Sequence, residues 1–463
     1  MTLKNDNGPG RALVFLNSLN LGGTEKAACL WAGYLAGRIR NGTASSDLQY
    51  VSALSLEDGP RRADLERLGV PLQILGAKNP ASAAAVAEAI ADADVIHAHA
   101  PGFPHQGDIL GAALRHLGRK IPVVQTNIFG KLQNPAENTW TDFRLFISWT
   151  SCVQAARRAG RKLNREFFRR QSVAVYPVEA ASAAESGKWK VESGKLRETL
   201  GLQSEHVLFG RFSRPEPNKW TPLVLDAFLD ALRESPKLRL LLREPPPLVA
   251  EQLCRHKLAA WPSTFGSRPT VPIILLPATS DPDELAISQM ACDVILHTSS
   301  IGESFGYGLA EPMALGKPVL TNSVPWHDQA QIELVCHAEC GLVSSTPAAM
   351  KTAILRLAGQ ETWRTGLGIA ARDHILQVAD PGTSTARVEM AMRCAIENQD
   401  NPFADEDLEK ARKTAAYLDK HQWGHSIQES AFLRSQNFRW TFLKWQRAFR
   451  DRLAGKDSPK SPR

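Results

Sequence analysis

Residues 272–299 read PIILLPATSDPDELAISQMACDVILHTS, which is one complete alternation of apolar run, helix and apolar run. The runs IILL and VILH are short and apolar, as expected of buried strands. Between them we expect a helix from Asp281 to Ala291. This order predicts a βαβ unit in a mostly parallel sheet that is covered on both faces.

The same alternation continues on both sides of this stretch. Before it come HVLFGRFS (206–213), a helix at 222–233 and LRLLL (238–242); after it come a helix at 308–315, PVLTN (318–322) and a helix at 347–359. These segments predict a Rossmann-like, nucleotide-binding type of domain over residues 201–395.

The first part of the chain repeats the pattern with ALVFL (12–16), YVSALSL (50–56), PLQIL (71–75), DVIHAHA (94–100) and IPVVQT (121–126). Helices are expected between them, the first from Thr24, as N-cap, to about Arg38. We therefore predict an α/β protein with two doubly wound domains that face a cleft, the first at 1–178. A linker is expected at 179–200, and a basic helical tail at 396–463, which is an appendage or returns to the first domain.

The composition narrows the class of protein. At 463 residues, 43% hydrophobic and 22% charged, the chain suits two globular domains. No apolar run reaches the roughly 20 residues that span a bilayer, and the N-terminus lacks an export leader, so we expect a cytoplasmic protein. The net charge of +7 favours anionic partners. RNA-binding signatures are absent, so nucleic acid is not an expected partner.

The seven cysteines are expected to be reduced thiols, because their number is odd and most lie in apolar segments. Cys336 and Cys340 flank His337, but no second ligand pair follows at the spacing of a zinc finger. We expect no metal site there and no bound cofactor.

The tract GESFGYGLAEPMALGKPVL (302–320) carries the chemistry-bearing residues of the second domain. Glu303 and Glu311 lie on either side of a glycine-rich junction between a loop and a helix. Gly306 and Gly308 let backbone amides approach an anion, and a helix N-terminus favours a diphosphate. Carboxylates suit sugar and ribose hydroxyls, as acidic residues do in dinucleotide sites.

Glu303, seven intervening residues and Glu311, followed by Pro312, Ala314, Gly316 and Pro318, resemble the E-x7-E motif of family 4 glycosyltransferases. Three further segments match this family in order: GGTEKAA (22–28), DVIHAHAPG (94–102) and GRFSRPEPNKW (210–220). The resemblance covers most of residues 11–395 and implies a GT-B fold and a retaining, metal-independent transfer of a sugar from a nucleoside-diphosphate donor.

The resemblance also implies residue roles. Arg211 and Lys219 bind the donor diphosphate, where fixed cations stabilise the charge of the leaving group. Glu303 holds sugar hydroxyls and Glu311 the ribose. The other donor-side positions implied are Ser304, Phe305, Gly306, Gly22 and Gly23.

Two histidines end a strand of the first domain. We expect His97 and His99 to point to opposite faces, with His99 toward the cleft. The resemblance implies that His99 hydrogen-bonds the transferring sugar, and no residue is assigned as a nucleophile. Arg214 is a second candidate for the phosphate, because the loop between Arg211 and Lys219 is longer than is usual in the family. The stretch LRLLLREPPP (238–247) replaces a glycine-rich turn that often borders the nucleotide.

Two basic segments have open interpretations. RRAGRKLNREFFRR (157–170) is expected as one helical stretch that contacts an anionic membrane or faces solvent. The second segment is amphipathic, and we expect it to lie at a membrane surface or to pack on the first domain. Its apolar stripe consists of Phe438, Phe442, Trp445, Phe449 and Leu453.

The sequence therefore predicts a glycosyltransferase whose acceptor is a saccharide, a lipid-linked molecule or a protein, either cytoplasmic or peripheral to the inner face of a membrane. Two alternatives stay open. One is a nucleotide-sugar epimerase, which would require paired acid/base carboxylates in the first domain. The other is a non-catalytic partner subunit that binds nucleotide sugar.

Overall fold

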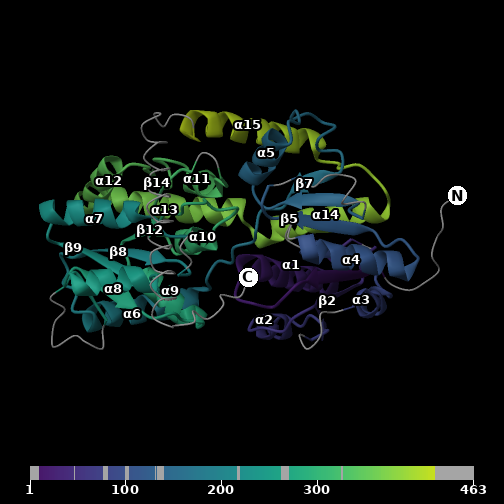
Figure 1. Cartoon of the computed structure of the whole chain (residues 1–463), viewed down its shortest axis with the longest axis horizontal. Helices are drawn as coiled ribbons and strands as arrows, with labels where there is room; N and C mark the ends of the chain where they lie inside the picture. Colours follow the sequence, from purple (N-terminus) through teal and green to yellow (C-terminus); the bar gives the residue numbers. More distant parts are fainter. Residues whose placement is uncertain are drawn as a thin grey trace, which may run out of the picture. The chain divides into compact units, whose positions relative to one another are not determined.

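The computed structural model describes residues 10–45, 47–76, 82–99, 104–130, 132, 140–215, 219–261, 271–324 and 327–422. The chain forms two compact units (Figure 1). Unit 1 contains Met1–Ala180, Ser304–Tyr307 and Ile375–Leu418. Unit 2 contains Ala181–Glu303, Gly308–His374 and the residues from Asp419 onward.

Unit 1 is built on a seven-stranded sheet in the order β3-β2-β1-β4-β5-β6-β7, in which every neighbouring pair is parallel. Its strands are β1 Arg11–Leu16, β2 Tyr50–Ser55, β3 Leu72–Ile74, β4 Val95–His99, β5 Val123–Asn127, β6 Phe143–Phe146 and β7 Gln171–Val173. Its helices are α1 Gly23–Arg40, α2 Arg62–Arg67, α3 Ala83–Ile90, α4 Pro104–Leu117, α5 Trp149–Arg158, α14 Pro381–Ile396 and most of α15 Ala404–Gln422.

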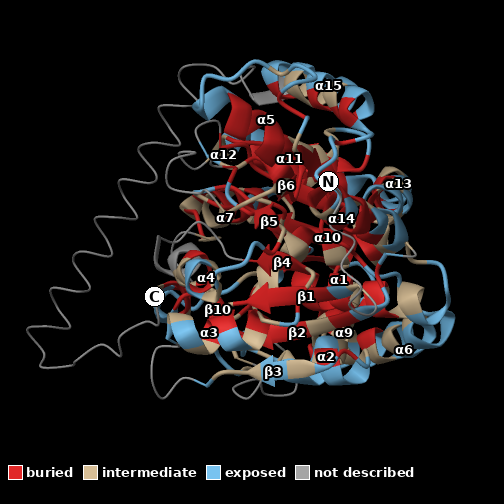
Figure 2. Ribbon diagram, turned by 90° about the vertical axis from the view of Figure 1, so that its right-hand side faces the viewer, coloured by how far each residue is buried: buried red, intermediate tan, exposed pale blue. Residues whose placement is uncertain are grey.

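The two faces of this sheet carry different helices. Leu13, Phe15 and Ile96 pack with α3 and α4 in one hydrophobic cluster. On the other face, α1 and α14 contact each other, and Trp31 of α1 packs against the histidines of β4. The strands are largely buried except for the edge strand β3, whereas exposed residues lie on the outer sides of helices such as α2 and α15 (Figure 2). Burial on both faces explains the continuous apolar runs in the sequence.

Unit 2 has a second seven-stranded parallel sheet, in the order β10-β11-β9-β8-β12-β13-β14. Its strands are β8 Val207–Phe212, β9 Leu238–Arg243, β10 Ala259–Ala260, β11 Ile273–Leu276, β12 Val294–His297, β13 Val319–Thr321 and β14 Gly341–Val343. Its helices are α6 Ala183–Thr199, α7 Pro222–Glu234, α8 Pro247–Arg255, α9 Pro282–Ala291, most of α10 Tyr307–Ala314, α11 Ala330–Val335, α12 Pro347–Gly359 and most of α13 Glu361–Val378. The helices α7, α8 and α12 pack on one face of the sheet in a single hydrophobic cluster.

The predicted fold class is confirmed: the chain is α/β, with two doubly wound parallel sheets and further helices after the second sheet. Residues 179–200 differ from the expected linker, because α6 occupies most of them. A capping box between Ser182 and Glu185 starts this helix, and Trp189 Nε1 donates to Asp283 Oδ1 on α9 at 3.0 Å.

The boundary expected at residue 395 also differs from the structure. The chain returns to unit 1 at Ile375, so the whole of α14 belongs to unit 1. Trp31 Nε1 donates to Ser384 Oγ at 2.8 Å, and Arg38 pairs with Glu389 at 2.9 Å. One of the two expectations for the tail at 396–463 is that it returns to the first domain. The chain does return there, but it does so at Ile375, before the tail begins. The amphipathic stripe at 438–453 lies outside the described residues.

Candidate functional site

Each sheet has one point where the strand order reverses. In unit 2 the chain builds outward from β8 on one side and from β12 on the other, so the reversal lies between these two neighbouring strands. In open α/β sheets, ligands bind beyond the carboxyl ends of the strands at such a point. Lys219 follows β8 and Glu303 follows β12. The sequence therefore folds two predicted site residues to the switch point of unit 2.

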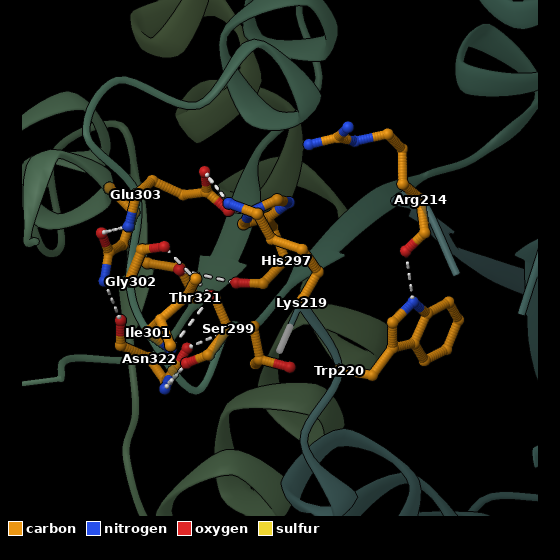
Figure 3. A network of polar contacts seen from close by, with 12 residues as sticks. Arg214, Lys219, Trp220, His297, Ser299, Ile301, Gly302, Glu303, Thr321 and Asn322 are labelled. Carbon is orange, nitrogen blue, oxygen red and sulfur yellow. Dashed lines mark hydrogen bonds and ion pairs between the residues drawn. The ribbon is translucent and has the colours of Figure 1, made fainter. Parts of the chain in front are cut away.

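Glu303 is the centre of a buried polar group in unit 2 (Figure 3). Its Oε2 accepts a hydrogen bond from Lys219 Nζ at 2.7 Å, and its Oε1 lies 3.0 Å from His297 Nε2. The residue is 8% exposed. Its backbone is also held, because its amide donates to Gln331 Oε1 at 3.0 Å and its carbonyl accepts from the Ala330 amide at 2.9 Å.

The charges in this group follow from burial and pairing. Burial alone would raise the pKa of Glu303, but the charge of Lys219 and hydrogen bonds from His297 and Lys219 outweigh it and lower the pKa to about 2. Burial lowers the pKa of His297, although the hydrogen bond and charge of Glu303 oppose that change. At neutral pH the site thus holds an ionised carboxylate and a neutral imidazole.

The loop that carries Glu303 is closed by its own polar contacts. Ser299 N donates to Asn322 Oδ1 at 3.0 Å, and Asn322 Nδ2 donates back to Ser299 O at 3.1 Å. Ser299 Oγ donates to Gly302 O at 3.0 Å. Gly302 has φ +67°, and a Cβ at this position would lie 1.6 Å from Asp328 O. Only glycine fits there, so the turn before Glu303 depends on it.

Arg211 lies at the end of β8, and the residue is 1% exposed. It donates to Thr298 O at 2.6 Å and Leu296 O at 3.4 Å, and also to Lys219 O. The guanidinium stacks on the Trp220 ring at 4.3 Å. Burial lowers its pKa to about 9, against the effect of the Glu303 charge. Arg211 therefore binds backbone carbonyls of β12 and of the loops that follow β8 and β12 in this structure, and its predicted role at the diphosphate stays a prediction.

Arg214 is exposed, and its carbonyl accepts from Trp220 Nε1 at 3.0 Å. Figure 3 shows it to one side of the Glu303 group. Residues 216–218, between Arg214 and Lys219, are outside the described part of the chain. The role of Arg214 as a second phosphate cation stays a prediction.

The residues after Glu303 divide between the units. Glu311 is half-buried on α10 of unit 2. Ser304–Tyr307 belong to unit 1, where Ser148 Oγ donates to Ser304 O at 2.9 Å and Tyr307 Oη donates to Pro177 O at 3.0 Å. Phe305 is 3% exposed and packs against two tyrosines, whereas Gly306 has φ +103°.

Gly308 has a local structural role. A Cβ at Gly308 would lie 3.1 Å from Phe212 O and 3.3 Å from His297 Cε1. The absence of a side chain therefore lets α10 pack closely against the ends of β8 and β12.

In unit 1 the strand order reverses between β1 and β4, and Gly22, Gly23 and His99 lie just beyond or at the carboxyl ends of these strands. The N-cap of α1 is Gly22, not the expected Thr24. A Cβ at Gly22 would lie 1.9 Å from Glu25 Oε2, and one at Gly23 would lie 3.1 Å from Tyr307 Cδ2.

The prediction that His97 and His99 point to opposite faces is wrong. Residues two apart on a strand share a face, and the two rings pack 4.2 Å apart, against Trp31. His97 Nε2 contacts Thr126 Oγ1 at 2.8 Å, whereas His99 is 1% exposed and its two ring nitrogens have no hydrogen-bond partner among the described residues. Burial lowers the pKa of His99 well below its ordinary value, so its ring is neutral.

The basic segment 157–170 is not one helix, because α5 ends at Arg158. Arg170 donates to the carbonyls of Asn398 and Gln399 at 2.8 Å, and Arg169 pairs with Asp400 at 3.1 Å. Arg169 and Arg170 of this basic segment thus bind the residues between α14 and α15.

Within the described residues, no group of three or more His, Cys, Asp or Glu side chains could hold a metal ion. His337 Nδ1 accepts from the Val343 amide at 2.9 Å, and Cys336 Sγ lies 3.5 Å from His374 Nε2. No helix in the described part of the chain is long and apolar enough to cross a membrane.

Three residues of the Glu303 group were not predicted from the sequence: His297, Asn322 and Gln331. His297 is the last residue of an apolar strand. A polar residue at the carboxyl end of a strand beside the switch point could have been recognised as a site candidate from the sequence. Asn322 likewise follows β13, whereas Gln331 lies on α11 and had no such signal.

No protein-family description and no curated protein sequence matches this chain. Solved structures do match. HepE of Anabaena, determined in complex with UDP and glucose, is 19% identical over 81% of this chain and 98% of its own, with a TM-score of 0.61. A glycosyltransferase from Rickettsia africae is 14% identical over 84% and 99% of the two chains, with a TM-score of 0.62.

The same architecture also occurs in a protein of another chemical class. A putative UDP-N-acetylglucosamine 2-epimerase from Listeria monocytogenes is 11% identical over 85% of this chain and 99% of its own, with a TM-score of 0.53. These likenesses concern the fold alone. The chain has the GT-B fold.

Proposed function

We propose that this chain is a glycosyltransferase that moves a sugar from a nucleoside-diphosphate-sugar donor to a saccharide, a lipid-linked molecule or a protein, with retention of configuration and without a metal ion. The observation that carries this proposal is the Lys219–Glu303–His297 group at the switch point of unit 2. The cation can bind the diphosphate of the donor, and the ionised carboxylate beside it can accept hydrogen bonds from hydroxyls of the attached sugar.

Each residue of the group has a distinct role in the proposed reaction. Lys219 binds the diphosphate and stabilises the negative charge that the leaving nucleoside diphosphate gains. Glu303, ionised because its pKa is about 2, accepts hydrogen bonds from sugar hydroxyls. Glu311 on α10 holds the ribose hydroxyls. From the sequence resemblance we also propose that His99 of unit 1 donates a hydrogen bond to the sugar; in this structure its ring is buried and neutral.

The transfer itself breaks the bond between the anomeric carbon and the phosphate oxygen. The acceptor oxygen forms its bond on the same face of the sugar, and its proton passes to the departing phosphate. This course assigns no enzyme nucleophile and makes the cations beside the phosphate the main catalytic groups.

The solved structures with this fold support the donor class. HepE has been determined in complex with UDP, with UDP-glucose, and with UDP and glucose. We accordingly propose a uridine nucleotide as the first donor to test.

One observation favours a second candidate, a partner subunit that binds nucleotide sugar without turning it over. The terminal nitrogens of Arg211 donate to carbonyls of residues 219, 296 and 298, rather than facing solvent. In a chain that had lost catalysis, the arginine predicted to bind the phosphate could bind backbone carbonyls instead without loss of function.

Donor binding tests the proposal directly. A thermal-shift panel of UDP, GDP, ADP and their common sugars, with and without EDTA, should show a selective shift that EDTA does not change. A ligand at 100 times its dissociation constant stabilises a protein by about 2.7 kcal/mol. Glu311→Ala should abolish the shift, because Glu311 is assigned to the ribose.

The matched control is Glu251→Ala, which removes an exposed glutamate paired with Arg255 on α8. It should bind the donor as the unmodified protein does. Unchanged donor binding in Glu311→Ala would remove Glu311 from the site. Selective binding with neither hydrolysis nor transfer across a range of acceptors would favour the partner subunit.

A further inference from the structure

His297 is held rigidly at the end of β12. Its side chain is 6% exposed, and its carbonyl accepts from Thr321 Oγ1 at 2.6 Å. The ring lies against the start of α10, where a Cβ on Gly308 would come within 3.3 Å of Cε1. The imidazole therefore has little room to change its orientation, and its Nε2 stays directed at Glu303.

The proton on this imidazole can be assigned from its partner. An ionised carboxylate only accepts hydrogen bonds, so the 3.0 Å contact with Glu303 Oε1 requires the proton on His297 Nε2. His297 Nδ1 then carries a lone pair, and it has no hydrogen-bond partner among the described residues. Within the described part of the chain, the ring thus makes one polar side-chain contact, and that contact is to Glu303.

The two partners of Glu303 differ in kind. His297 is a rigid neutral donor, whereas Lys219 is a cation on a flexible four-carbon chain whose side chain is 21% exposed. Under the proposed function, the diphosphate of an incoming donor attracts the Lys219 ammonium. Glu303 and the diphosphate therefore share or compete for the same cation.

We propose that His297 is a positioning residue that keeps the Glu303 carboxylate in place when Lys219 turns to the donor diphosphate. The inference rests on the proposed function and adds a residue to it. With His297 present, Glu303 retains one hydrogen bond and its orientation toward the sugar. Without it, Lys219 would be the only side-chain partner of Glu303 among the described residues, and Glu303 would withhold that cation from the diphosphate.

The test compares diphosphate binding in four variants by titration calorimetry. The probe is whichever of UDP, GDP and ADP the unmodified protein binds most tightly. His297→Phe keeps an aromatic ring but removes the donor, and it should weaken binding roughly tenfold to a hundredfold, the effect of one hydrogen bond to a charged group. His297→Gln, which keeps an N–H donor, should lose less.

A double substitution separates positioning from a general loss of structure. Adding Glu303→Gln to His297→Phe removes the charge that withholds Lys219, so diphosphate affinity should recover, while sugar transfer should stay abolished. Glu303→Gln alone should bind the free diphosphate at least as tightly as the unmodified protein does. This last measurement remains decisive if His297→Phe does not fold.

The matched control is His206→Gln. His206 is half-buried just before β8, at the opposite end of that strand, where its ring contacts Arg239. This variant should bind the diphosphate normally.

The outcomes distinguish the two proposals. An unmodified protein that binds none of the three diphosphates overturns the proposed function and this inference together. Normal affinity in His297→Phe overturns the inference alone, as does weakened binding that Glu303→Gln does not restore. Weakened binding in Glu303→Gln alone also overturns the inference, because it shows that Glu303 does not compete with the diphosphate for Lys219.

Discussion

Replacing Lys219 with methionine should destabilise unit 2, because it leaves the buried Glu303 carboxylate without its charged partner. The pKa of Glu303 falls from 4.5 to about 2 in the folded protein. At about 1.4 kcal/mol for each tenfold change in acidity, this corresponds to roughly 3 kcal/mol of stability. The charge of Lys219 is the largest effect that lowers this pKa. We therefore expect Lys219→Met to lose about 2 to 3 kcal/mol at pH 7.

The sign of the pH dependence provides an internal check. A depressed carboxyl pKa contributes stability that is complete above pH 4.5 and is lost as the pH falls through 2. The difference between the unmodified protein and Lys219→Met should therefore be constant near pH 7 and narrow below pH 4.5.

Urea unfolding followed by circular dichroism would measure this difference at pH 7 and pH 3.5. Lys219→Met combined with Glu303→Gln should be more stable than Lys219→Met alone, because position 303 then no longer carries a buried carboxylate without its Lys219 partner. Equal stability of the unmodified protein and Lys219→Met at pH 7 would refute the reasoning, and so would a double variant no more stable than the single one.

Three further predictions concern residues around the two switch points. Arg211→Lys should lose about 2 kcal/mol in urea unfolding, because one ammonium cannot reach all the carbonyls that the guanidinium binds; unchanged stability would contradict that role. Gly302→Ala should lose about 3 kcal/mol or more, given φ +67° and a Cβ 1.6 Å from a carbonyl oxygen, whereas Gly187→Ala on α6, where a Cβ meets open space, should be neutral or gain up to about 1 kcal/mol. Burial lowers the pKa of His97 to about 3 and that of His99 well below 6.5, so the folded state binds fewer protons than the unfolded chain below pH 6.5. Each should remove about 1.4 kcal/mol of stability per pH unit of acidification, and a thermal-unfolding midpoint that does not change between pH 7 and pH 5.5 would contradict this.

The fold was largely predictable from the sequence because strands buried on both faces appear as continuous apolar runs. Residues 347–359 coincide with α12, and the expected helix at 281–291 differs from α9 by one residue. The helix α6 was missed because only one of its residues is buried, so it shows no apolar stripe. Its start was nevertheless readable, since Ser182 and Glu185 have the spacing of a capping box.

The site was predictable only in part. Lys219 and Glu303 could be paired in advance because both follow strands that the topology makes neighbours. The contact of Glu303 with His297 could not, because it depends on how the loop between them closes. That closure is made by Asn322 and Gln331, which lie about 20 to 30 residues later in the chain. Sequence spacing within a single motif contains no information about such contacts.

The placement of α14 has a consequence for the order in which the protein can fold during synthesis. The sheet of unit 1 is complete at Val173, but the helix that packs beside α1 on that sheet begins at Pro381. At about 5–20 residues per second, a ribosome needs roughly 10 to 40 seconds for the intervening stretch of about 200 residues. Throughout that interval Trp31 lacks its partner Ser384. The nascent first unit therefore exposes an apolar face while the second unit is synthesised. Chaperones that recognise apolar surfaces can bind the nascent chain during this interval.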